Sequence, residues 1–515
     1  MSAAVAETIP GGPAAVIGAG TMGRGIAQTL AVAGYEVLLF DRNETAARDA
    51  VAFVGTMLNR AAGKGLMSPE AAMAAEARIA VATSLAGLAP AAILIEAIAE
   101  SLDAKQRLFA QLEGIVSPQA VLATNTSSLS VSAIAAGIDQ PGRMVGLHFF
   151  NPVPLMKIVE VIPGLRTEER ATRAALDVAE AIGYRAILCR DAPGFLINHA
   201  GRGLTTEGCR IVQENIATEV DVDRVMREAA GFRMGPFELL DLTGLDVSLP
   251  VLRLIYDQFY QEPRYRPGVH LAARVAAGLN GRKTGEGFYR YVNGQRMDPP
   301  EPEPPAGPLP RLWAPPQMRG DLSELLGACA DCGVLVEDDP SPPAEGVLLV
   351  APWGWDATTT AQRFELDARR VMAVDPLTLD RERVTIMSTP LTETAVHDGL
   401  HRALRAAGRH VTAIADSPGF IAQRVLATIV NIGCEIAQME IAAPRDIDDG
   451  VRLGLGYPDG PLALGDRIGA ERVLAILEAM QALYGDPRYR PSIWLRRCAT
   501  LGIPLSSRHC REALV

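Results

Sequence analysis

The sequence predicts an α/β fold class, in which a doubly wound parallel sheet is followed by an all-α helical domain that occurs twice. Three observations predict it. Buried-strand patterns alternate with helical patterns over the first 190 residues, as expected of a parallel sheet with helices on both faces. Strand signals then fade, and helical periodicity dominates to about residue 280. The motif DAPGF at 191–195 recurs as DSPGF at 416–420.

Length and charge limit the classes of protein to consider. A chain of 515 residues exceeds what one hydrophobic core usually supports, so two to four domains are expected. The net charge of −11 argues against a nucleic-acid or anionic-membrane partner. The start, MSAAVAETIPGG, has no basic region followed by an apolar stretch, and no run of about 18 apolar residues follows, which predicts a cytoplasmic protein.

The seven cysteines are an odd number and are scattered, as expected of reduced thiols. Cys329 and Cys332 form a lone CxxC without a second pair or nearby histidines. This pattern favours two incidental thiols over a redox or metal site. We therefore predict no metal.

The first elements follow each other in an order typical of nucleotide-binding domains. A strand over 14–18 leads into a glycine turn, a helix over 26–34 and a second strand over 35–43. Further buried strands are expected at 92–98 and 119–126, separated by a helix over 101–114. The sequence therefore predicts a Rossmann-type domain over 1–190.

The glycine turn carries a GxGxxG pattern formed by Gly18, Gly20 and Gly23, with Thr21 and Met22 inside it. These glycines allow a tight turn and the approach of a pyrophosphate to the helix N-terminus. Asp41 ends the next strand, where its carboxylate can accept hydrogen bonds from a ribose and repel a 2′-phosphate.

NAD is therefore expected rather than NADP, although Arg42 beside Asp41 leaves NADP open. FAD is a further alternative, which the short spacing between the glycines and Asp41 disfavours. A glycine turn that binds no nucleotide also occurs in such folds.

The repeat extends well beyond DAPGF. A shift of 225 residues superposes Gly208-Cys209 on Gly433-Cys434 and Gly235-Pro236 on Gly460-Pro461, and it also aligns the acidic positions Asp221, Asp223 and Asp241 with Asp446, Asp448 and Asp466. We therefore divide the remaining chain into a first helical domain, a Pro-rich linker, a truncated Rossmann-like segment without GxGxxG, and a second helical domain: 191–290, 291–318, 319–415 and 416–515. The stretch DPPEPEPPAGPLP (298–310) predicts that the linker is extended and exposed.

At this point the chain resembles a known family, the 3-hydroxyacyl-CoA dehydrogenases. The motifs that carry the resemblance are VIGAGTMGRGIA, EAIAESLDAK, NTSSL, GLHFFNPVPLMKIVEV, DAPGFLIN and GPFELLDLTGLD, which together cover residues 14–290. The second half resembles the extra helical domain of longer members, including those linked to phenylacetate breakdown. The resemblance implies NAD as cofactor, an acyl-CoA substrate, and (3S)-3-hydroxyacyl-CoA oxidation in phenylacetate or fatty-acid degradation.

The resemblance also assigns roles to residues. His148 is implied as the general acid/base and Glu160 as its orienting partner, with Ser127 and Asn198 contacting the substrate oxygen and His148. The positions lining the nicotinamide and its ribose are implied to be Glu100, Lys105 and Asn125. Arg60 and Lys64 fall where the family's helical hairpin approaches coenzyme A, although an exposed basic helix face is the more common meaning.

The residues themselves support an acid–base role for His148. Oxidation of an alcohol removes a hydride from carbon and a proton from oxygen, and histidine is the side chain suited to take that proton near neutral pH. Glu160 lies in KIVEVI (157–162), a strand-like segment that can pair with the segment ending at His148 through the turn at 151–154. The alternative is a packed core histidine bonded to a backbone carbonyl.

The duplication helps to choose between these readings. At the 225 shift, Ala373 stands opposite His148, Thr385 opposite Glu160 and Gln423 opposite Asn198. The second copy thus lacks all three residues while keeping the turn and packing residues, so the scaffold tolerates their absence and the catalytic reading is favoured.

Other functions stay open. The 3-hydroxyacid dehydrogenases act on small free acids with a catalytic lysine, and some relatives are structural proteins that bind dinucleotide without turnover. Within the leading class the acyl chain length stays open: the resemblance implies 3-hydroxyadipyl-CoA for members of the phenylacetate type and 3-hydroxybutyryl-CoA for short-chain members. The terminal carboxylate of the adipyl chain needs a cation, for which Arg233 and Arg202 are candidates.

Each helical domain of this family buries an apolar face against another, normally from a partner subunit. We therefore expect residues 191–290 and 416–515 to form an internal pseudo-dimer, with a homodimer as the alternative.

Overall fold

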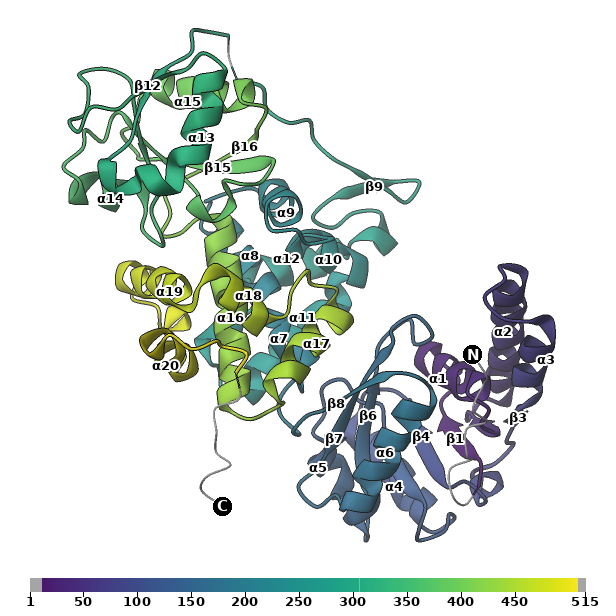
Figure 1. Cartoon of the computed structure of the whole chain (residues 1–515). Coiled ribbons are helices and arrows are strands. Elements are labelled where there is room, and N and C mark those ends of the chain that lie inside the picture. The colour runs from purple at the N-terminus through teal and green to yellow at the C-terminus, as the bar shows by residue number, and fades with distance from the viewer. Residues whose placement is uncertain (1–11, 305, 508–515) are drawn as a thin grey trace. The chain divides into compact units, whose positions relative to one another are not determined.

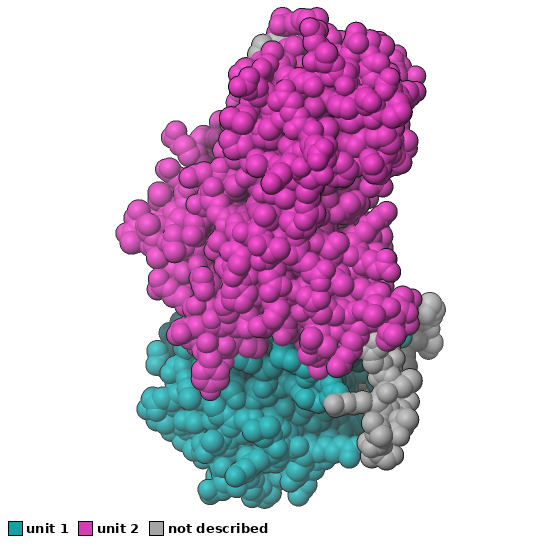
Figure 2. Space-filling model, turned by 90° about the vertical axis from the view of Figure 1, so that its left-hand side faces the viewer, with its two compact units in different colours: residues 1–199, 439–455 teal, residues 200–438, 456–515 magenta. Residues whose placement is uncertain are grey.

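The computed structural model describes residues 12–304 and 306–507, so the start of the chain on which the location was argued lies almost wholly outside the described residues. The chain divides into two compact units, which Figure 2 colours separately. The first contains the chain up to His199 together with 439–455, and the second contains 200–438 and the chain from Gly456 onward. The division does not follow the repeat, because a segment of the second helical copy belongs to the first unit.

The first unit is built on an eight-stranded sheet (Figure 1) with the order β3-β2-β1-β4-β5-β6-β7-β8. All neighbouring pairs are parallel except β6 and β7, which are antiparallel. The strands are β1 Ala14–Ile17, β2 Val37–Phe40, β3 Ile79–Val81, β4 Ile93–Glu96, β5 Val121–Thr124, β6 Met144–Phe149, β7 Ile158–Pro163 and β8 Arg185–Leu188.

Helices cover both faces of this sheet. Consecutive residues of its central strands, such as Leu94 and Ile95, are therefore buried. The helices are α1 Thr21–Val32, α2 Glu44–Gly63, α3 Pro69–Ala77, α4 Leu102–Glu113, α5 Val131–Ala135 and α6 Glu169–Ala181. Apolar residues of α1, α2, α3 and α6 share one core with the sheet. The predicted Rossmann-type fold class is confirmed.

The second unit contains most of both helical repeats. The first repeat begins with α7 Ile197–Ala200, whose residues up to His199 belong to the first unit. It continues with α8 Arg202–Gln213, α9 Glu219–Glu228, α10 Pro236–Thr243, α11 Leu245–Gln258 and α12 Val269–Ala276, followed by the hairpin β9 Arg290–Val292 and β10 Gln295–Met297. The second repeat has α16 Ile421–Gln438, α17 Pro444–Leu455, α18 Pro461–Ile468, α19 Ala470–Tyr484 and α20 Ile493–Leu501. Of these, α17 belongs to the first unit.

Equivalent elements of the two repeats touch each other inside the second unit. Helix α8 packs on α16, and the short 3₁₀ helices η3 (Pro263–Tyr265) and η7 (Pro487–Tyr489), the two copies of Pro-Arg-Tyr, are also in contact. The helices approach closely at Gly203, where a Cβ would lie 3.0 Å from the Ile429 side chain.

The recurring aspartates have a structural task. The carboxylate of Asp191 in DAPGF accepts hydrogen bonds from the backbone N–H groups of Val131 (3.0 Å) and Ser132 (2.7 Å) at the start of α5. In the second copy, Asp416 accepts them from Ala357 (2.8 Å) and Thr358 (3.2 Å). A carboxylate at a helix N-terminus satisfies free N–H groups and the helix dipole, which explains why the residue is retained in both copies.

A second sheet lies between the repeats in sequence, with the order β12-β11-β13-β14-β15-β16. Its strands are β11 Arg311–Trp313, β12 Leu335–Glu337, β13 Val347–Val350, β14 Val371–Val374, β15 Arg383–Ser388 and β16 His410–Ile414, and its helices are α13 Arg319–Asp331, α14 Ala357–Arg363 and α15 Thr394–Ala406. Elements β15 and α15 begin 225 residues after β7 and α6, and β14 pairs with β15 antiparallel as β6 does with β7. The segment therefore corresponds to the later half of the first sheet and has no counterpart of the glycine turn.

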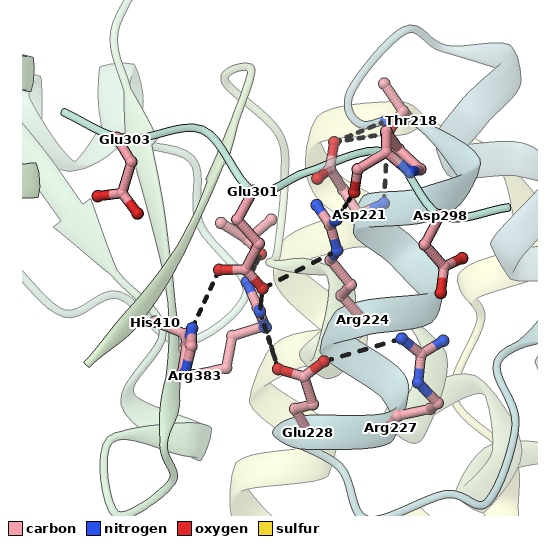
Figure 3. Close-up of polar contacts among 12 residues, drawn as sticks. Thr218, Asp221, Arg224, Arg227, Glu228, Asp298, Glu301, Glu303, Arg383 and His410 are labelled. Atoms are coloured by element: carbon pink, nitrogen blue, oxygen red, sulfur yellow. Dashed lines mark hydrogen bonds and ion pairs between the residues drawn. The ribbon is translucent and has the colours of Figure 1, made fainter. Parts of the chain in front are cut away.

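Most of the described residues in the Pro-rich stretch 298–310 are exposed and lie outside helices and strands, as predicted, but the linker as a whole also contains short strands and a paired acidic side chain. Strand β11 begins inside it, and Glu301 is not free in solvent but pairs with Arg383 of β15 and His410 of β16 (3.0 Å), beside Arg224 of α9 (Figure 3). Arg383 also contacts Glu228 of α9, with its Nε 2.8 Å from the carboxylate. The partners of Glu301 lie far away in sequence, so composition did not predict these contacts.

No helix among the described residues is long and apolar enough to cross a membrane.

Candidate active site

The glycine turn between β1 and α1 leaves an open space at the helix N-terminus. Gly18 has a φ of +103°, and a Cβ there would lie 2.5 Å from the Ala97 carbonyl oxygen; at Gly23 it would lie 1.7 Å from that of Gly18. The chain itself therefore requires these two glycines. At Gly20 a Cβ would meet nothing within 4 Å, so the room there is available to a ligand. An anion such as a pyrophosphate fits the N–H groups at this end.

Asp41 follows β2 at the edge of the same space. Its carboxylate accepts hydrogen bonds from the backbone N–H groups of Ala19 and Asn43, both at 2.9 Å, which fix its position. A hollow of about 430 Å³ is lined by Gly18, Gly20, Asp41, Arg42 and the residues after β4. Thr21 and Met22 form the first turn of α1 beside it.

Lys105 of α4 is wholly buried between two carboxylates. Its Nζ lies 2.6 Å from Glu96 and 3.4 Å from Glu100. Glu96, at the end of β4, also accepts hydrogen bonds from Thr124 Oγ1 and from the N–H of Ile98, both at 2.7 Å. The two carboxylates stabilise the positive charge of Lys105, which is buried away from water.

Glu100 organises the turn after β5. Its Oε1 accepts hydrogen bonds from Thr126 Oγ1 (2.7 Å), the N–H (2.9 Å) and Oγ (3.3 Å) of Ser127, and Ser128 Oγ (2.9 Å). Burial acts to raise the pKa of Glu100, but Lys105 and these donors act in the opposite sense, and the pKa lies below its ordinary value. The carboxylate therefore stays charged and holds Ser127 in place.

The structure brings His148 and Glu160 together on adjacent strands. They are direct partners in the antiparallel β6–β7 pair, and Nδ1 of His148 lies 2.6 Å from Oε2 of Glu160. Glu160 is fully buried and His148 is 5% exposed. The other carboxylate oxygen of Glu160 accepts hydrogen bonds from the N–H groups of Leu196 and Ile197, both at 2.9 Å. This arrangement is not that of a core histidine bonded to a backbone carbonyl.

Aromatic side chains cover the imidazole. The ring centroids of Phe150 and Phe195 lie 4.4 Å and 5.9 Å from that of His148. These apolar walls restrict water around the ring and strengthen its interaction with Glu160.

Asn125 and Asn198 hold neighbouring backbone. Asn125 accepts a hydrogen bond at Oδ1 from the N–H of Phe149 (2.8 Å), and Asn198 donates from Nδ2 to the carbonyl oxygen of Ser127 (3.2 Å). In the second copy Gln423 donates in the same way to the carbonyl oxygen of Pro352 (3.1 Å). The 225-residue shift places Gln423 opposite Asn198, so the sequence analysis counted Asn198 as lost from the second copy. Gln423 nevertheless makes the equivalent contact with the turn.

The register of the second copy differs from that of the first. Ala373 is paired with Met387 rather than with Thr385, a shift of two residues relative to His148 and Glu160. Asp375 is fully buried there, where it binds Gln423 Nε2 (2.9 Å), and burial raises its pKa to about 6.

Of the four predicted basic residues, Arg60 and Lys64 belong to the first unit, and Arg202 and Arg233 belong to the second. Arg60 and Lys64 are exposed at the end of α2. Arg233 lines a hollow of about 430 Å³ in the second unit together with Arg227, Arg282 and Arg296. Burial lowers the pKa of Arg202 to about 10, with Tyr457 nearby.

The sequence analysis did not identify Glu96, nor the backbone N–H groups of Leu196 and Ile197 that bind Glu160. A glutamate ending a buried strand is a signal that could have found Glu96. The donors to Glu160 are backbone N–H groups, which every residue except proline carries, so the identity of the side chains gives no signal for them. Among the described residues no group of three or more His, Cys, Asp or Glu side chains is arranged to hold a metal ion, and Cys329 is buried while Cys332 is exposed.

Comparison with known proteins gives two matches to family models. The model described as "3-hydroxyacyl-CoA dehydrogenase, NAD binding domain" matches residues 13–192. The model described as "3-hydroxyacyl-CoA dehydrogenase, C-terminal domain" matches twice, at residues 194–291 and 419–504.

Individual relatives match over nearly the whole chain or over its first half. The 3-hydroxyadipyl-CoA dehydrogenase of Escherichia coli K12 is 36% identical over 487 residues, which cover 95% of this chain and 97% of the relative. The probable 3-hydroxybutyryl-CoA dehydrogenase of Bacillus subtilis is 40% identical over 54% of this chain and 96% of its own length. A crystal structure of 3-hydroxybutyryl-CoA dehydrogenase from E. coli K12 matches with a TM-score of 0.84, 35% identity, and coverage of 95% of this chain and 98% of that chain.

Proposed function

The chain belongs to the 3-hydroxyacyl-CoA dehydrogenase family and is an NAD-dependent enzyme of that class, and on this premise we propose that His148 and Glu160 are its acid–base pair. The proposed reaction interconverts (3S)-3-hydroxyacyl-CoA and 3-oxoacyl-CoA. The observation that carries the proposal is the 2.6 Å contact between Nδ1 of His148 and the buried Glu160 carboxylate.

The proton chemistry follows from this contact. Because Nδ1 donates to Glu160, the other ring nitrogen, Nε2, is the one that accepts the hydroxyl proton of the substrate. The imidazolium then lies against a carboxylate that stabilises its charge. In the reverse direction the same nitrogen returns the proton to the 3-oxo group. Glu160 stays fixed throughout, since Leu196 and Ile197 donate to its second oxygen.

The residues around the glycine turn fit NAD. When bound, NAD supplies the nicotinamide that exchanges hydride with C3 of the substrate. We propose that the N-terminus of α1 at Gly20 holds the pyrophosphate and that Asp41 binds the adenine-side ribose. Glu100, Lys105 and Asn125 would line the nicotinamide side. The open space at Gly20 and the fixed carboxylate of Asp41 support this assignment.

We assign Ser127 and Asn198 to the substrate oxygen and Arg60 with Lys64 to coenzyme A. The exposed position of the two basic side chains on α2 is compatible with a phosphorylated ligand. Charge reversal of both, Arg60→Glu with Lys64→Glu, should raise KM for the CoA ester and leave KM for NADH unchanged. An unchanged KM for the ester would remove them from the site.

A dicarboxylic acyl group is the preferred substrate in this proposal. The full-length relative is named for 3-hydroxyadipyl-CoA, and Arg233 has no ion pair among the described contacts while its neighbours Arg227 and Arg296 bind Glu238. Arg233→Ala should lower activity on the adipyl substrate relative to the butyryl substrate, with Arg202→Ala as the second candidate. An unchanged ratio in both variants would refute the carboxylate assignment.

The second half is proposed to be architectural, forming a pseudo-dimer of 191–290 with 416–515 inside one chain. The packing of α8 on α16 and of η3 on η7 supports this. Truncation after Met297 should yield an aggregating or self-associating protein with reduced activity. A soluble, fully active monomer would contradict the proposed pseudo-dimer.

The assay that tests the proposed function follows NADH consumption with acetoacetyl-CoA, beside NADPH and beside free acetoacetate. Turnover with the CoA ester and NADH alone is expected. Turnover of the free acid would favour a 3-hydroxyacid dehydrogenase, and cofactor binding without turnover, also on 3-oxoadipyl-CoA, would favour a structural relative. We further infer a cytoplasmic enzyme of phenylacetate or fatty-acid degradation, which the six free cysteines among the described residues support.

A further inference from the structure

The carboxylate of Glu160 is held by two residues that precede and begin α7. Leu196 and Ile197 each donate a backbone N–H to Oε1, and both side chains are fully buried. The position of these two N–H groups therefore sets the position of Glu160 and, through it, of His148.

The helix packed on this segment comes from the second repeat. Helix α17 contacts β7 and β8 within the first unit. Arg185 of β8 binds Asp446 and Asp449 of α17, and the N–H of Arg190 donates to the carbonyl oxygen of Ile441 at 2.8 Å. These polar contacts hold α17 against the sheet that carries the proposed catalytic pair.

Two glycines form the contact itself. A Cβ on Gly450 would lie 2.8 Å from Cδ2 of Leu196, and one on Gly454 would lie 2.7 Å from Cδ1 of Ile197. The glycines are four residues apart and therefore share one face of α17. Glycine inside a helix is unfavourable relative to alanine, so its presence twice on one face needs a reason.

The repeat supplies a comparison within the molecule. At the equivalent positions of the first repeat stand Val225 in α9 and Ala229, the residue that follows α9. Helix α9 packs instead on β15 of the second sheet. The fold of the repeat therefore does not require glycine at these positions, and the glycines belong to the copy that lies against Leu196 and Ile197.

We propose that Gly450 and Gly454 are positioning residues for the Glu160–His148 pair. By allowing α17 to approach closely, they let Leu196 and Ile197 lie where both N–H groups reach Glu160. This inference rests on the proposed role of that pair. It gives the second repeat a task in catalysis, although its own copies of His148 and Glu160 are lost.

Gly450→Ala tests the inference in the full chain. The added methyl would press on Leu196, displace its N–H from Glu160 and lower kcat by about tenfold or more, since small misplacements of catalytic groups are costly. The Kd for NADH should not change, and the pH profile of kcat/KM should shift, because the imidazole loses part of its carboxylate partner. Gly454→Ala should act in the same way through Ile197.

Matched variants separate positioning from general damage. Gly327→Ala, inside α13 where a Cβ would meet nothing within 4 Å, should leave kcat and the pH profile unchanged. Leu196→Val removes the atom that the new methyl meets, so Gly450→Ala with Leu196→Val should recover most of the lost kcat. A melting curve of each variant shows whether it is folded.

The outcomes distinguish the inference from the proposed function. If the unaltered enzyme turns over acetoacetyl-CoA but both glycine variants keep its kcat and pH profile, the inference is wrong and the function stands. A loss of kcat that Leu196→Val does not restore would also overturn it. If His148→Ala is inactive while Gly450→Ala is unaffected, the acid–base role of His148 stands and the proposed role of α17 in positioning the pair is wrong.

Discussion

The side-chain amide of Asn198 donates a hydrogen bond to the carbonyl oxygen of Ser127, at 3.2 Å. The second copy repeats this bond between Gln423 and Pro352, at 3.1 Å, where no catalytic histidine exists. A contact retained without the chemistry serves the scaffold, so Asn198, which we propose also contacts the substrate oxygen, ties the turn after β5 to the start of the helical repeat.

Asn198→Ala should therefore have two effects of moderate size. The free energy of unfolding should fall by about 1 kcal/mol for the lost hydrogen bond, and kcat should fall less than in His148→Ala. Chemical denaturation and steady-state kinetics on the same preparation measure both. A kcat loss equal to that of His148→Ala with no change in stability would make Asn198 purely catalytic.

Asp41 is predicted to select NAD over its 2′-phosphorylated form. Asp41→Ala removes the proposed ribose acceptor and the charge that repels a phosphate, so KM for NADH should rise by about tenfold, the worth of one good hydrogen bond. The ratio of NADPH to NADH activity should rise as well. Arg42→Ala is the control, and it should lower any residual use of NADPH. Unchanged cofactor preference in Asp41→Ala would place the ribose elsewhere.

Arg424 of α16 and Glu207 of α8 join the two repeats through a buried ion pair, with Nε and Nη2 both 2.8 Å from Oε1. Both side chains are fully buried. Removal of one partner leaves a buried charge, so Arg424→Met or Glu207→Leu alone should cost about 3–5 kcal/mol of unfolding free energy. The double variant should recover much of that loss. Additive losses in the cycle would mean that the two residues do not depend on each other.

Asp375 makes the second sheet sensitive to pH. Burial raises its pKa from 3.8 in the unfolded chain to about 6 in the fold, so the folded state prefers the protonated acid. This contribution to stability is complete below the unfolded pKa and is lost as pH rises through the folded pKa. Relative to Asp375→Asn, the unfolding free energy of the unaltered protein should fall by up to about 3 kcal/mol between roughly pH 4 and 6.

Asparagine is a fitting replacement because Oδ2 of Asp375 has no hydrogen-bond partner, while Oδ1 binds Gln423. Denaturant midpoints across this pH range measure the difference. A difference that stays constant with pH would show that Asp375 is ionised in the fold throughout.

Features of the fold that depend on local patterns or on the internal repeat could be predicted from the sequence. The glycine turn, the strands at 93–96 and 121–124 and the truncation of the second sheet followed from periodicity and from the 225-residue shift. The closeness of His148 and Glu160 was expected from a turn between two strand-like segments, and the register of β6 and β7 places them opposite each other.

Contacts between distant segments were beyond such patterns. Nothing near Glu301 indicates Arg383 and His410 as partners, and nothing in α17 indicates that it packs on β7 instead of on the second sheet. Buried charges such as Glu96 were also missed, because their neighbours come from other strands. These contacts depend on tertiary packing, which a single sequence does not display.

The central claim is that His148 moves the substrate proton, and the most direct measurement compares the unaltered enzyme with His148→Ala in the reduction of acetoacetyl-CoA by NADH. The claim predicts a fall in kcat of about 10²–10⁴-fold, with the Kd for NADH unchanged, because only the proton transfer is lost. A variant that keeps its kcat would contradict the assignment of His148 and Glu160 as the acid–base pair.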